Sequence, residues 1–158
     1  MKSCAVIPGS FDPITNGHLD VVMRAREIFD RVILLVMDNG SKRCMFDLEE
    51  RLSIARAAVD GLDGVEARSC NGLLCEYAKK HDAVIVKGAR NSVDFEYECS
   101  LYEINRELEG CETVILPAKK EHSFVSSTFV RELLRYGREL DKYVPEAAVA
   151  RIKELING

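Results

Sequence analysis

The chain has 158 residues, of which 47% are hydrophobic and 30% are charged. This composition is typical of a water-soluble globular protein, and the length suits a single domain with one sizeable core, spanning residues 1–158. The formal net charge of −4 at pH 7 argues against a general nucleic-acid-binding protein, because such proteins have a strongly basic surface. An anionic small molecule is not excluded, since its site needs only a local cluster of cations.

Nothing in the sequence points to a membrane or to secretion. The apolar stretch near the N-terminus stops at Pro8, too early for a secretory leader, and no apolar run approaches the roughly 20 residues that cross a bilayer. The six cysteines form no C-x-x-C pair and only three histidines are present, so a structural zinc site is not expected. We therefore expect reduced thiols in a cytoplasmic protein that binds neither membranes nor nucleic acids.

Strands and helices are predicted to alternate along the chain. The pattern predicts a strand at residues 4–7, a helix at 17–29, a strand at 32–37, a helix at 47–59 with Asp47 and Glu50 in capping-box positions, a strand at 65–68 and a helix at 73–80. It continues with a strand at 83–87, a helix at 93–108, a strand at 113–116 and closing helices at 127–136 and 146–156.

Alternation of this kind implies βαβ units with right-handed crossovers. We therefore predict the α/β class, as a Rossmann-like, doubly wound parallel sheet of five strands in the order 3-2-1-4-5 with helices on both faces. Ligands of such sheets bind beyond the carboxyl ends of the strands, where the strand order reverses.

The first candidate at that edge is Thr15-Asn16-Gly17-His18, which opens the helix after the first strand. A helix N-terminus offers backbone N–H groups and partial positive charge to a phosphate. Gly17 would allow close approach of the ligand, and His18 could add a hydrogen-bond donor. The alternative is an ordinary helix cap followed by a surface histidine, which is the commoner meaning of such a tetrapeptide alone.

Three further polar clusters follow strands at the same edge. These are Ser41, Lys42 and Arg43 after the second strand, Lys87, Gly88 and Arg90 at the end of the fourth, and residues 122–128 with Arg131 after the fifth. Each cluster alone also fits a turn, a helix cap or solvated cations, and the sequence contains neither G-x-G-x-x-G nor a P-loop motif. Four weak phosphate signals at one sheet edge together indicate a phosphate-binding site.

Residues 8–18, with the sequence PGSFDPITNGH, resemble the N-terminal signature of the bacterial phosphopantetheine adenylyltransferase family. This family belongs to the nucleotidyltransferases with a T/H-x-G-H motif, and residues 126–131 resemble the superfamily's S-S-T-x-x-R motif. Further matches are Ser41-Lys42, Met45-Phe46, residues 48–51, residues 87–90 and residues 94–98. The matches occur in the family's order and cover nearly the whole chain.

The resemblance implies that the adenylyl group of ATP is transferred to 4′-phosphopantetheine, giving 3′-dephospho-coenzyme A and pyrophosphate in coenzyme A biosynthesis. It also implies Mg²⁺ as cofactor without assigning it a protein ligand, a homohexamer, and catalytic roles for His18, which would stabilise the transition state, and for Lys42. The implied phosphopantetheine contacts are Ser10, Lys42, Leu74 and Lys87. The implied ATP contacts are Ser10, Phe11, His18, Gly88, Ala89, Arg90, Glu98, His122, Ser123, Phe124, Val125, Ser126, Ser127 and Thr128.

Three positions depart from the family pattern, because Ser10, Lys87 and His122 stand where Thr, Arg and an aromatic such as Trp are common. The implied nucleophile is a phosphate anion, so the reaction needs no general base and would rest on positioning and electrostatic stabilisation. Other interpretations remain open. They are a sibling nucleotidyltransferase acting on nicotinamide mononucleotide or on a choline- or glycerol-type phosphate, a nucleotide-binding regulator without turnover, and a thiol redox protein.

Overall fold

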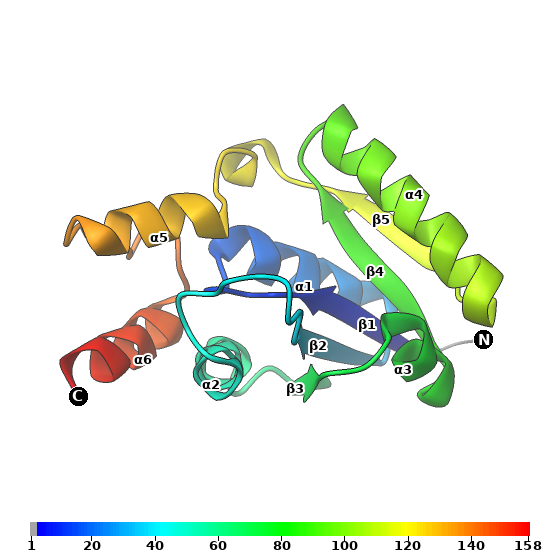
Figure 1. Cartoon of the computed structure of the whole chain (residues 1–158), viewed down its shortest axis with the longest axis horizontal. Coiled ribbons are helices and arrows are strands. Elements are labelled where there is room, and N and C mark those ends of the chain that lie inside the picture. Colours follow the sequence, from blue (N-terminus) through cyan, green and yellow to red (C-terminus); the bar gives the residue numbers. More distant parts are fainter. Residues whose placement is uncertain (1–2) are drawn as a thin grey trace.

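A parallel sheet lies at the centre of the part of the chain that this computed structural model describes, residues 3–158 (Figure 1). Its 5 strands are β1 (Cys4–Gly9), β2 (Arg31–Met37), β3 (Val65–Cys70), β4 (Ala83–Ala89) and β5 (Thr113–Pro117). They pair in parallel in the order β3-β2-β1-β4-β5. The α/β class and the strand order predicted from the alternating pattern are therefore confirmed.

Helices connect the strands and cover both faces of the sheet. They are α1 (Asn16–Ile28), α2 (Leu48–Val59), α3 (Leu74–Lys80), α4 (Ser92–Glu109), α5 (Ser127–Arg135) and α6 (Glu146–Asn157), with a 3-10 turn, η1 (Lys120–His122), before α5. Alternate side chains of a strand point to opposite faces. In β1, Ala5 and Ile7 pack with the core under α1 and α2, whereas Cys4 and Val6 pack toward α3.

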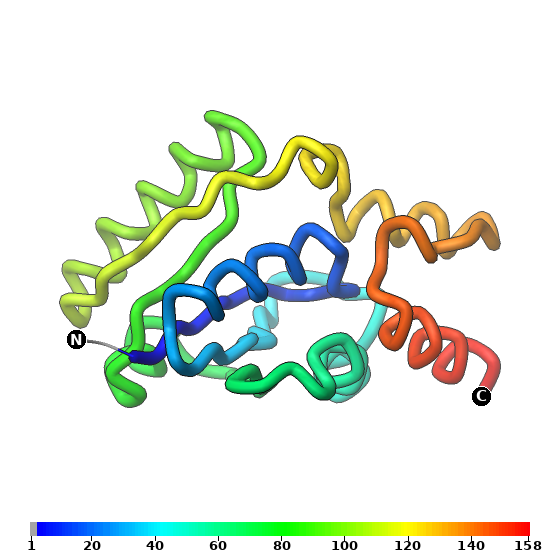
Figure 2. The backbone as a smooth tube through the Cα atoms, turned by 180° about the vertical axis from the view of Figure 1, so that it is seen from behind, coloured from blue at the N-terminus to red at the C-terminus, as the bar shows by residue number. Residues whose placement is uncertain are grey.

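The C-terminal helices α5 and α6 lie at one end of the molecule and α3 and α4 at the other, as Figure 2 shows from behind. Helix α6 packs against α2, and its residues Ala148 and Ile152 share one buried cluster with Ala5 of β1. The hydrophobic core therefore extends from the first strand to the last helix. None of the helices in residues 3–158 combines the length and the apolarity that a membrane crossing requires.

Three strands run two residues further than the sequence predicts, and β3 is one of them because it continues through Ser69 and Cys70, which pair with β2. Strand β1 continues through Pro8 and Gly9, and β4 continues through Gly88 and Ala89. Proline and glycine usually end or weaken strands, but here β1 keeps its pairing with β2, and β4 keeps its pairing with β5, over these residues. Lys87 and Gly88 consequently belong to the sheet itself and do not start a loop.

Candidate active site

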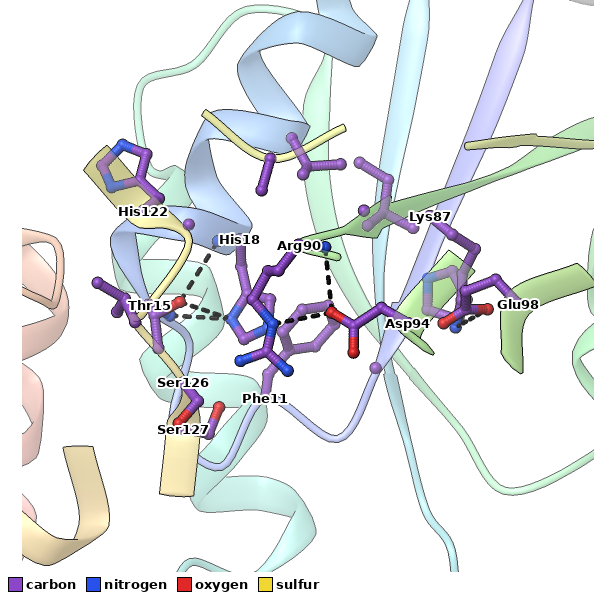
Figure 3. A pocket seen from close by; sticks show the side chains of 18 of the residues that line it. Phe11, Thr15, His18, Lys87, Arg90, Asp94, Glu98, His122, Ser126 and Ser127 are labelled. Atoms are coloured by element: carbon purple, nitrogen blue, oxygen red, sulfur yellow. Dashed lines mark hydrogen bonds and ion pairs between the residues drawn. The ribbon is translucent and has the colours of Figure 1, made fainter. Parts of the chain in front are cut away.

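The sheet opens between β1 and β4 at the carboxyl ends of its strands. These two strands pair as far as Val6 opposite Ile85, and beyond this point they separate. A cavity of about 430 Å³ lies in the opening, walled by both strands and by the first turns of α1, α4 and α5 (Figure 3). The cavity is at the point where strand order reverses, as predicted, and its volume suits a small molecule.

Thr15 and His18 cap the first turn of α1 in a reciprocal pair. Oγ1 of Thr15 accepts a hydrogen bond from the backbone N–H of His18 across 3.4 Å, and Nδ1 of His18 accepts one from the backbone N–H of Thr15 across 3.0 Å. A backbone N–H can only donate, so Nδ1 carries no proton and the neutral ring is protonated at Nε2. The ring lines the cavity and therefore brings an Nε2–H donor to it.

The loop between β1 and α1 holds His18 in a defined orientation. The rings of Phe11 and His18 meet edge to face, with centroids 5.0 Å apart. Phe11 is buried and has φ of 47°, a left-handed conformation that is uncommon outside glycine and often found at functional sites. Gly9 makes room for its ring, because a Cβ at Gly9 would lie 2.9 Å from Cζ of Phe11.

The surroundings of His18 keep its ring uncharged. Burial, together with the positive charges of Arg90 and Lys87, lowers the pKa of His18 to about 4. At neutral pH the ring is therefore a hydrogen-bond donor without a net charge, among cations that supply the positive charge of the cavity.

Lys87 in β4 and Arg90 just after it face carboxylates of α4 (Figure 3). Nζ of Lys87 lies 3.2 Å from Oε2 of Glu98, and both side chains are largely buried. Nε of Arg90 lies 2.9 Å from Oδ2 of Asp94, and this hydrogen bond holds the pKa of the Asp94 carboxyl below its usual range. All four side chains line the cavity, so the carboxylates of α4 orient the two cations toward it.

Hydroxyl side chains form the first turn of α5 beside the cavity. Oγ of Ser126 accepts the backbone N–H of Phe129 across 3.1 Å, which makes Ser126 the cap of the helix. Oγ of Ser127 donates to the carbonyl of Pro13 across 2.8 Å and ties α5 to the loop after β1. The capping alternative is therefore correct for Ser126, yet Ser126, Ser127 and Thr128 also line the cavity.

Arg131 does not contribute to the cavity wall, in contrast to the prediction that groups it with the phosphate-binding residues. Its guanidinium donates to the carbonyl of Asp12 across 2.7 Å and to Oγ1 of Thr128 across 3.1 Å. The side chain stabilises the loops around the site, because its position one turn into α5 brings it over the segment between β1 and α1.

Most residues that the resemblance implies as contacts meet at this cavity. From the ATP set it is lined by Phe11, His18, Gly88, Arg90, Glu98, His122, Val125, Ser126, Ser127 and Thr128, and from the phosphopantetheine set by Lys42 and Lys87. The residues of these sets outside its lining are Ser10, Leu74, Ala89, Ser123 and Phe124. Leu74 lines a second, much smaller cavity that also reaches Lys87 and Glu98.

Comparison with known proteins agrees with the phosphate-binding cavity that the geometry indicates. The family model described as cytidylyltransferase-like matches residues 6–133. A phosphopantetheine adenylyltransferase from Thermotoga neapolitana is 45% identical over 157 residues, which are 98% of this chain and 98% of that protein. The chain belongs to the cytidylyltransferase-like family. The predicted resemblance and the assignment as a nucleotidyltransferase are thus confirmed.

Solved structures share the fold of this cytidylyltransferase-like chain. A provisionally assigned nicotinate-nucleotide adenylyltransferase from Vibrio parahaemolyticus matches with a TM-score of 0.73 and 22% identity, over 98% of this chain and 93% of that one. A bifunctional NMN adenylyltransferase/ADP-ribose pyrophosphatase from Francisella tularensis, complexed with AMP and a manganese ion, matches with a TM-score of 0.75 and 14% identity, over 100% of this chain and 50% of that one. These identities show the fold alone.

In this cytidylyltransferase-like site, Asp94 and Tyr97 also line the cavity, although no role for them is predicted from the sequence. Asp94 lies in the first turn of α4, where an acidic side chain is favoured, and this position just after Arg90 could have indicated a role for Asp94. For Tyr97 we find no comparable signal, because an aromatic residue in an amphipathic helix usually belongs to the core.

Proposed function

We propose that this protein transfers the adenylyl group of ATP to 4′-phosphopantetheine, giving 3′-dephospho-coenzyme A and pyrophosphate. The observation that carries the proposal is the presence of the His18 donor and of three cations in one cavity at the switch point; these cations are Lys42, Lys87 and Arg90. Two polyanionic substrates and a departing pyrophosphate need cationic side chains and hydrogen-bond donors that can contact their phosphates. The relative with 45% identity, named as a phosphopantetheine adenylyltransferase, supports the choice of acceptor.

The reaction is a direct in-line displacement without a covalent enzyme intermediate. A phosphate oxygen of the acceptor attacks the α-phosphorus of ATP, the bond from that phosphorus to the oxygen bridging to the β-phosphorus breaks, and pyrophosphate leaves with the electron pair. The nucleophile is already an anion, so no side chain has to remove a proton. The protein contributes orientation and stabilises the charge that grows on the α-phosphate and on the leaving group.

On the ATP side, Nε2–H of His18 donates to an oxygen of the α-phosphate as negative charge develops there. The first turns of α1 and α5 offer backbone N–H groups and hydroxyls to the triphosphate, an arrangement that favours phosphate binding. Arg90 stabilises the pyrophosphate. The other proposed ATP contacts are Ser10, Phe11, Gly88, Ala89, Glu98 and residues 122–128, as the resemblance implies.

On the acceptor side, Lys42 and Lys87 bind the phosphate of 4′-phosphopantetheine, together with Ser10. Lys42 stands on an exposed loop, so its ammonium can follow the phosphate as the new bond forms. Leu74 offers an apolar contact to the pantetheine arm, since the small cavity that it lines adjoins Lys87. A lysine at position 87 supplies a compact point charge to this phosphate, whereas an arginine would supply a planar fork.

Mg²⁺ is the proposed cofactor, and it would bind together with the triphosphate of ATP. The cavity carboxylates Asp94 and Glu98 are each paired with a cation. Within residues 3–158 no three His, Cys, Asp or Glu side chains are grouped to hold a metal ion. A site without its own group of metal ligands fits a magnesium ion that would be held mainly by phosphate oxygens and water, which is common in nucleotide sites. When bound, the ion neutralises part of the phosphate charge.

A panel of acceptors tests this function. The wild-type protein is incubated with ATP, Mg²⁺ and, in turn, 4′-phosphopantetheine, nicotinamide mononucleotide, phosphocholine or glycerol 3-phosphate, and pyrophosphate release is measured. We expect pyrophosphate release with 4′-phosphopantetheine and with none of the other three acceptors. Release with one of the other acceptors would identify a sibling nucleotidyltransferase, and release with none would identify a nucleotide-binding regulator. Activity that depends only on the thiol redox state would point to a redox protein.

We also propose that the protein acts as a single domain in a homo-oligomer, hexameric as the resemblance implies. None of the hydrophobic residues of α4 is buried, and Val93, Tyr97, Ile104 and Leu108 are exposed along one side of this helix. An apolar stripe of this size on a water-exposed helix is typical of an interface. Sedimentation of the wild-type protein and of Ile104→Glu tests the assembly.

The six cysteines are thiols in the structure, which fits the reducing cytoplasm.

A further inference from the structure

Two charged side chains outside the cavity, Asp12 and Arg51, are almost completely buried, each with 3% of its surface exposed. Both contact the segment of residues 38–46, which brings Lys42 to the lining of the cavity. This segment connects β2 to α2 (Figure 1). We call this segment the Lys42 loop. The proposed function assigns Lys42 to the phosphate of the acceptor, so whatever holds this loop also decides where that cation lies.

Arg51 fastens the two ends of the Lys42 loop. Its Nη1 donates to the carbonyl of Met37, the residue before the loop, across 2.9 Å, and its Nε donates to the carbonyl of Phe46, the last residue of the loop, across 3.2 Å. The same Nη1 donates to the carbonyl of Ser10 across 2.7 Å. One rigid guanidinium thus joins both ends of the loop to the segment between β1 and α1.

Asp12 holds the N–H groups at the end of the same loop. Its Oδ2 accepts the backbone N–H of Met45 across 2.8 Å, and its Oδ1 accepts the backbone N–H of Phe46 across 3.0 Å. The peptide groups of Phe46 are therefore held on both sides, the N–H by Asp12 and the carbonyl by Arg51. Arg131 of α5 donates to the carbonyl of Asp12, which extends the contact to the third wall of the cavity.

Stability alone gives little reason to bury Arg51. Its carboxylate partner, Asp38, lies 3.8 Å from Nη2 and has 47% of its side chain exposed, so the ion pair is long and open to water. Replacing a buried ion pair by well-packed apolar side chains is often neutral or stabilising. An apolar side chain cannot supply a planar set of donors in fixed directions, and this is what three carbonyls from two segments require.

We propose that Arg51, together with Asp12, is a positioning residue that holds the base of the Lys42 loop so that Lys42 reaches the phosphate of the acceptor. Neither side chain lines the cavity, so both act through the segments that they hold, chiefly the Lys42 loop. The inference rests on the proposed function, because Lys42 is assigned to 4′-phosphopantetheine there.

Arg51→Lys is the first variant for the test. It keeps the positive charge but replaces the planar fork by one ammonium, which cannot hold the three carbonyls in their present directions. We expect kcat/KM for 4′-phosphopantetheine to fall by about 10–100-fold, the loss that follows from misplacing a reacting group by about 1 Å. The Kd of ATP, measured by calorimetry, should stay close to that of the wild type.

A double-mutant cycle with Lys42→Ala distinguishes positioning from general support of the fold. Once Lys42 is absent, Arg51 has no cation to position, so adding Arg51→Lys to Lys42→Ala should cost little further kcat/KM. A purely structural role would lower kcat/KM by the same factor in both backgrounds.

Hydrogen exchange gives a readout that does not depend on activity. The amides of the Lys42 loop should exchange faster in Arg51→Lys than in the wild type. The matched control is Arg26→Lys, because Arg26 also donates to two carbonyls, those of Asp63 across 2.8 Å and Phe29 across 3.0 Å, at the opposite edge of the sheet. This control should change neither the exchange of the Lys42 loop nor the acceptor kinetics.

If Arg51→Lys does not fold, the isosteric Asp12→Asn enters the same cycle with the same expected results.

The outcomes separate this proposal from the proposed function. Equal losses in both backgrounds of the cycle, or unchanged exchange in the Lys42 loop, would overturn the positioning role while leaving the wild-type reaction intact. A wild-type protein that releases no pyrophosphate with 4′-phosphopantetheine would refute the proposed function and, with it, the role of the loop in binding that acceptor. The exchange result would then decide separately whether Arg51 and Asp12 hold the loop.

Discussion

The backbone N–H of Thr15 donates a hydrogen bond to Nδ1 of His18 across 3.0 Å, and this bond decides which nitrogen of the ring carries the proton. With Nδ1 occupied as an acceptor, the neutral ring is protonated at Nε2. Burial, with the charges of Arg90 and Lys87, lowers the pKa of His18 to about 4, and protonation of Nδ1 would also break the helix cap. The side chain of His18 thus helps to cap the N-terminus of α1 and also brings an Nε2–H donor to the cavity.

The first prediction concerns the protonation state of His18 in the ligand-free protein. Nitrogen chemical shifts of labelled protein, followed from about pH 8 to about pH 5, should show a neutral His18 ring with the proton on Nε2 throughout, because this range lies above its lowered pKa. The variant His18→Gln identifies the resonances. A titration midpoint near the ordinary value of 6.5, or a proton on Nδ1, would contradict the assigned tautomer and environment.

The same pKa shift predicts how stability depends on pH. Between the ordinary pKa of 6.5 and the lowered pKa of about 4, the unfolded state binds more protons at His18 than the folded state does. The free energy of unfolding therefore falls as the pH falls through this window. His18→Gln can still cap the helix but does not titrate. Urea unfolding at two pH values in the window should show the wild type losing more stability than this variant; equal losses would contradict the shift.

Replacing the His18 donor should affect turnover far more than folding or ATP binding. We expect His18→Ala to lose about 10²–10³ in kcat, the usual effect of removing one donor to a developing oxyanion, and to lose about 1 kcal/mol of stability with the cap. Pyrophosphate release measures the turnover, ATP calorimetry measures the binding of the nucleotide, and urea unfolding measures the stability. His81→Ala is the control, because His81 lies at the end of α3 and outside the cavity lining. Near-normal turnover of His18→Ala would exclude its proposed role.

Lys42 and Arg43 are neighbouring exposed cations, but only Lys42 lines the cavity. Lys42→Ala should therefore raise KM for 4′-phosphopantetheine or lower kcat more than it weakens ATP binding. Arg43→Ala removes the same charge from the same loop and should leave both substrates nearly unaffected, since exposed charges are screened by salt. Steady-state kinetics with each substrate varied, together with ATP calorimetry, give the ranking. If Lys42→Ala weakens ATP binding more than it affects the kinetics of 4′-phosphopantetheine, Lys42 contacts ATP and not the acceptor.

The alternation of strands and helices was sufficient to predict the strand order, because short connections and right-handed crossovers leave few arrangements of five parallel strands. The ends of β1 and β4 were predicted too early. Pro8 and Gly88 are poor strand residues by themselves, but the neighbouring strands β2 and β5 keep them in register. Strand ends depend on the partner strand, and local sequence does not contain that information.

The lining of the candidate site was predictable where a residue lies at the carboxyl ends of the strands, as His18 and Lys87 do. The supporting residues were not predictable in the same way. An arginine in an amphipathic helix such as Arg51 is expected in water, since charged side chains are rarely buried. Its burial depends on three carbonyls from segments far apart in the sequence, which only the folded chain brings together.

A substitution at Gly17 should affect the stability of the fold and the binding of the ligand in different ways. A Cβ at Gly17 would meet Cβ of His122 at 3.6 Å, an ordinary contact, and alanine is the better helix former by about 1 kcal/mol. Gly17→Ala should therefore fold with unchanged or higher Tm, while its methyl group occupies space in the cavity and raises the Kd of ATP. In Gly88→Ala the new Cβ would lie 2.9 Å from Cγ2 of Val21, so this variant should lose stability. Thermal unfolding and ATP calorimetry of both variants test the contrast, and unchanged ATP affinity in Gly17→Ala would show that the nucleotide does not approach the first turn of α1.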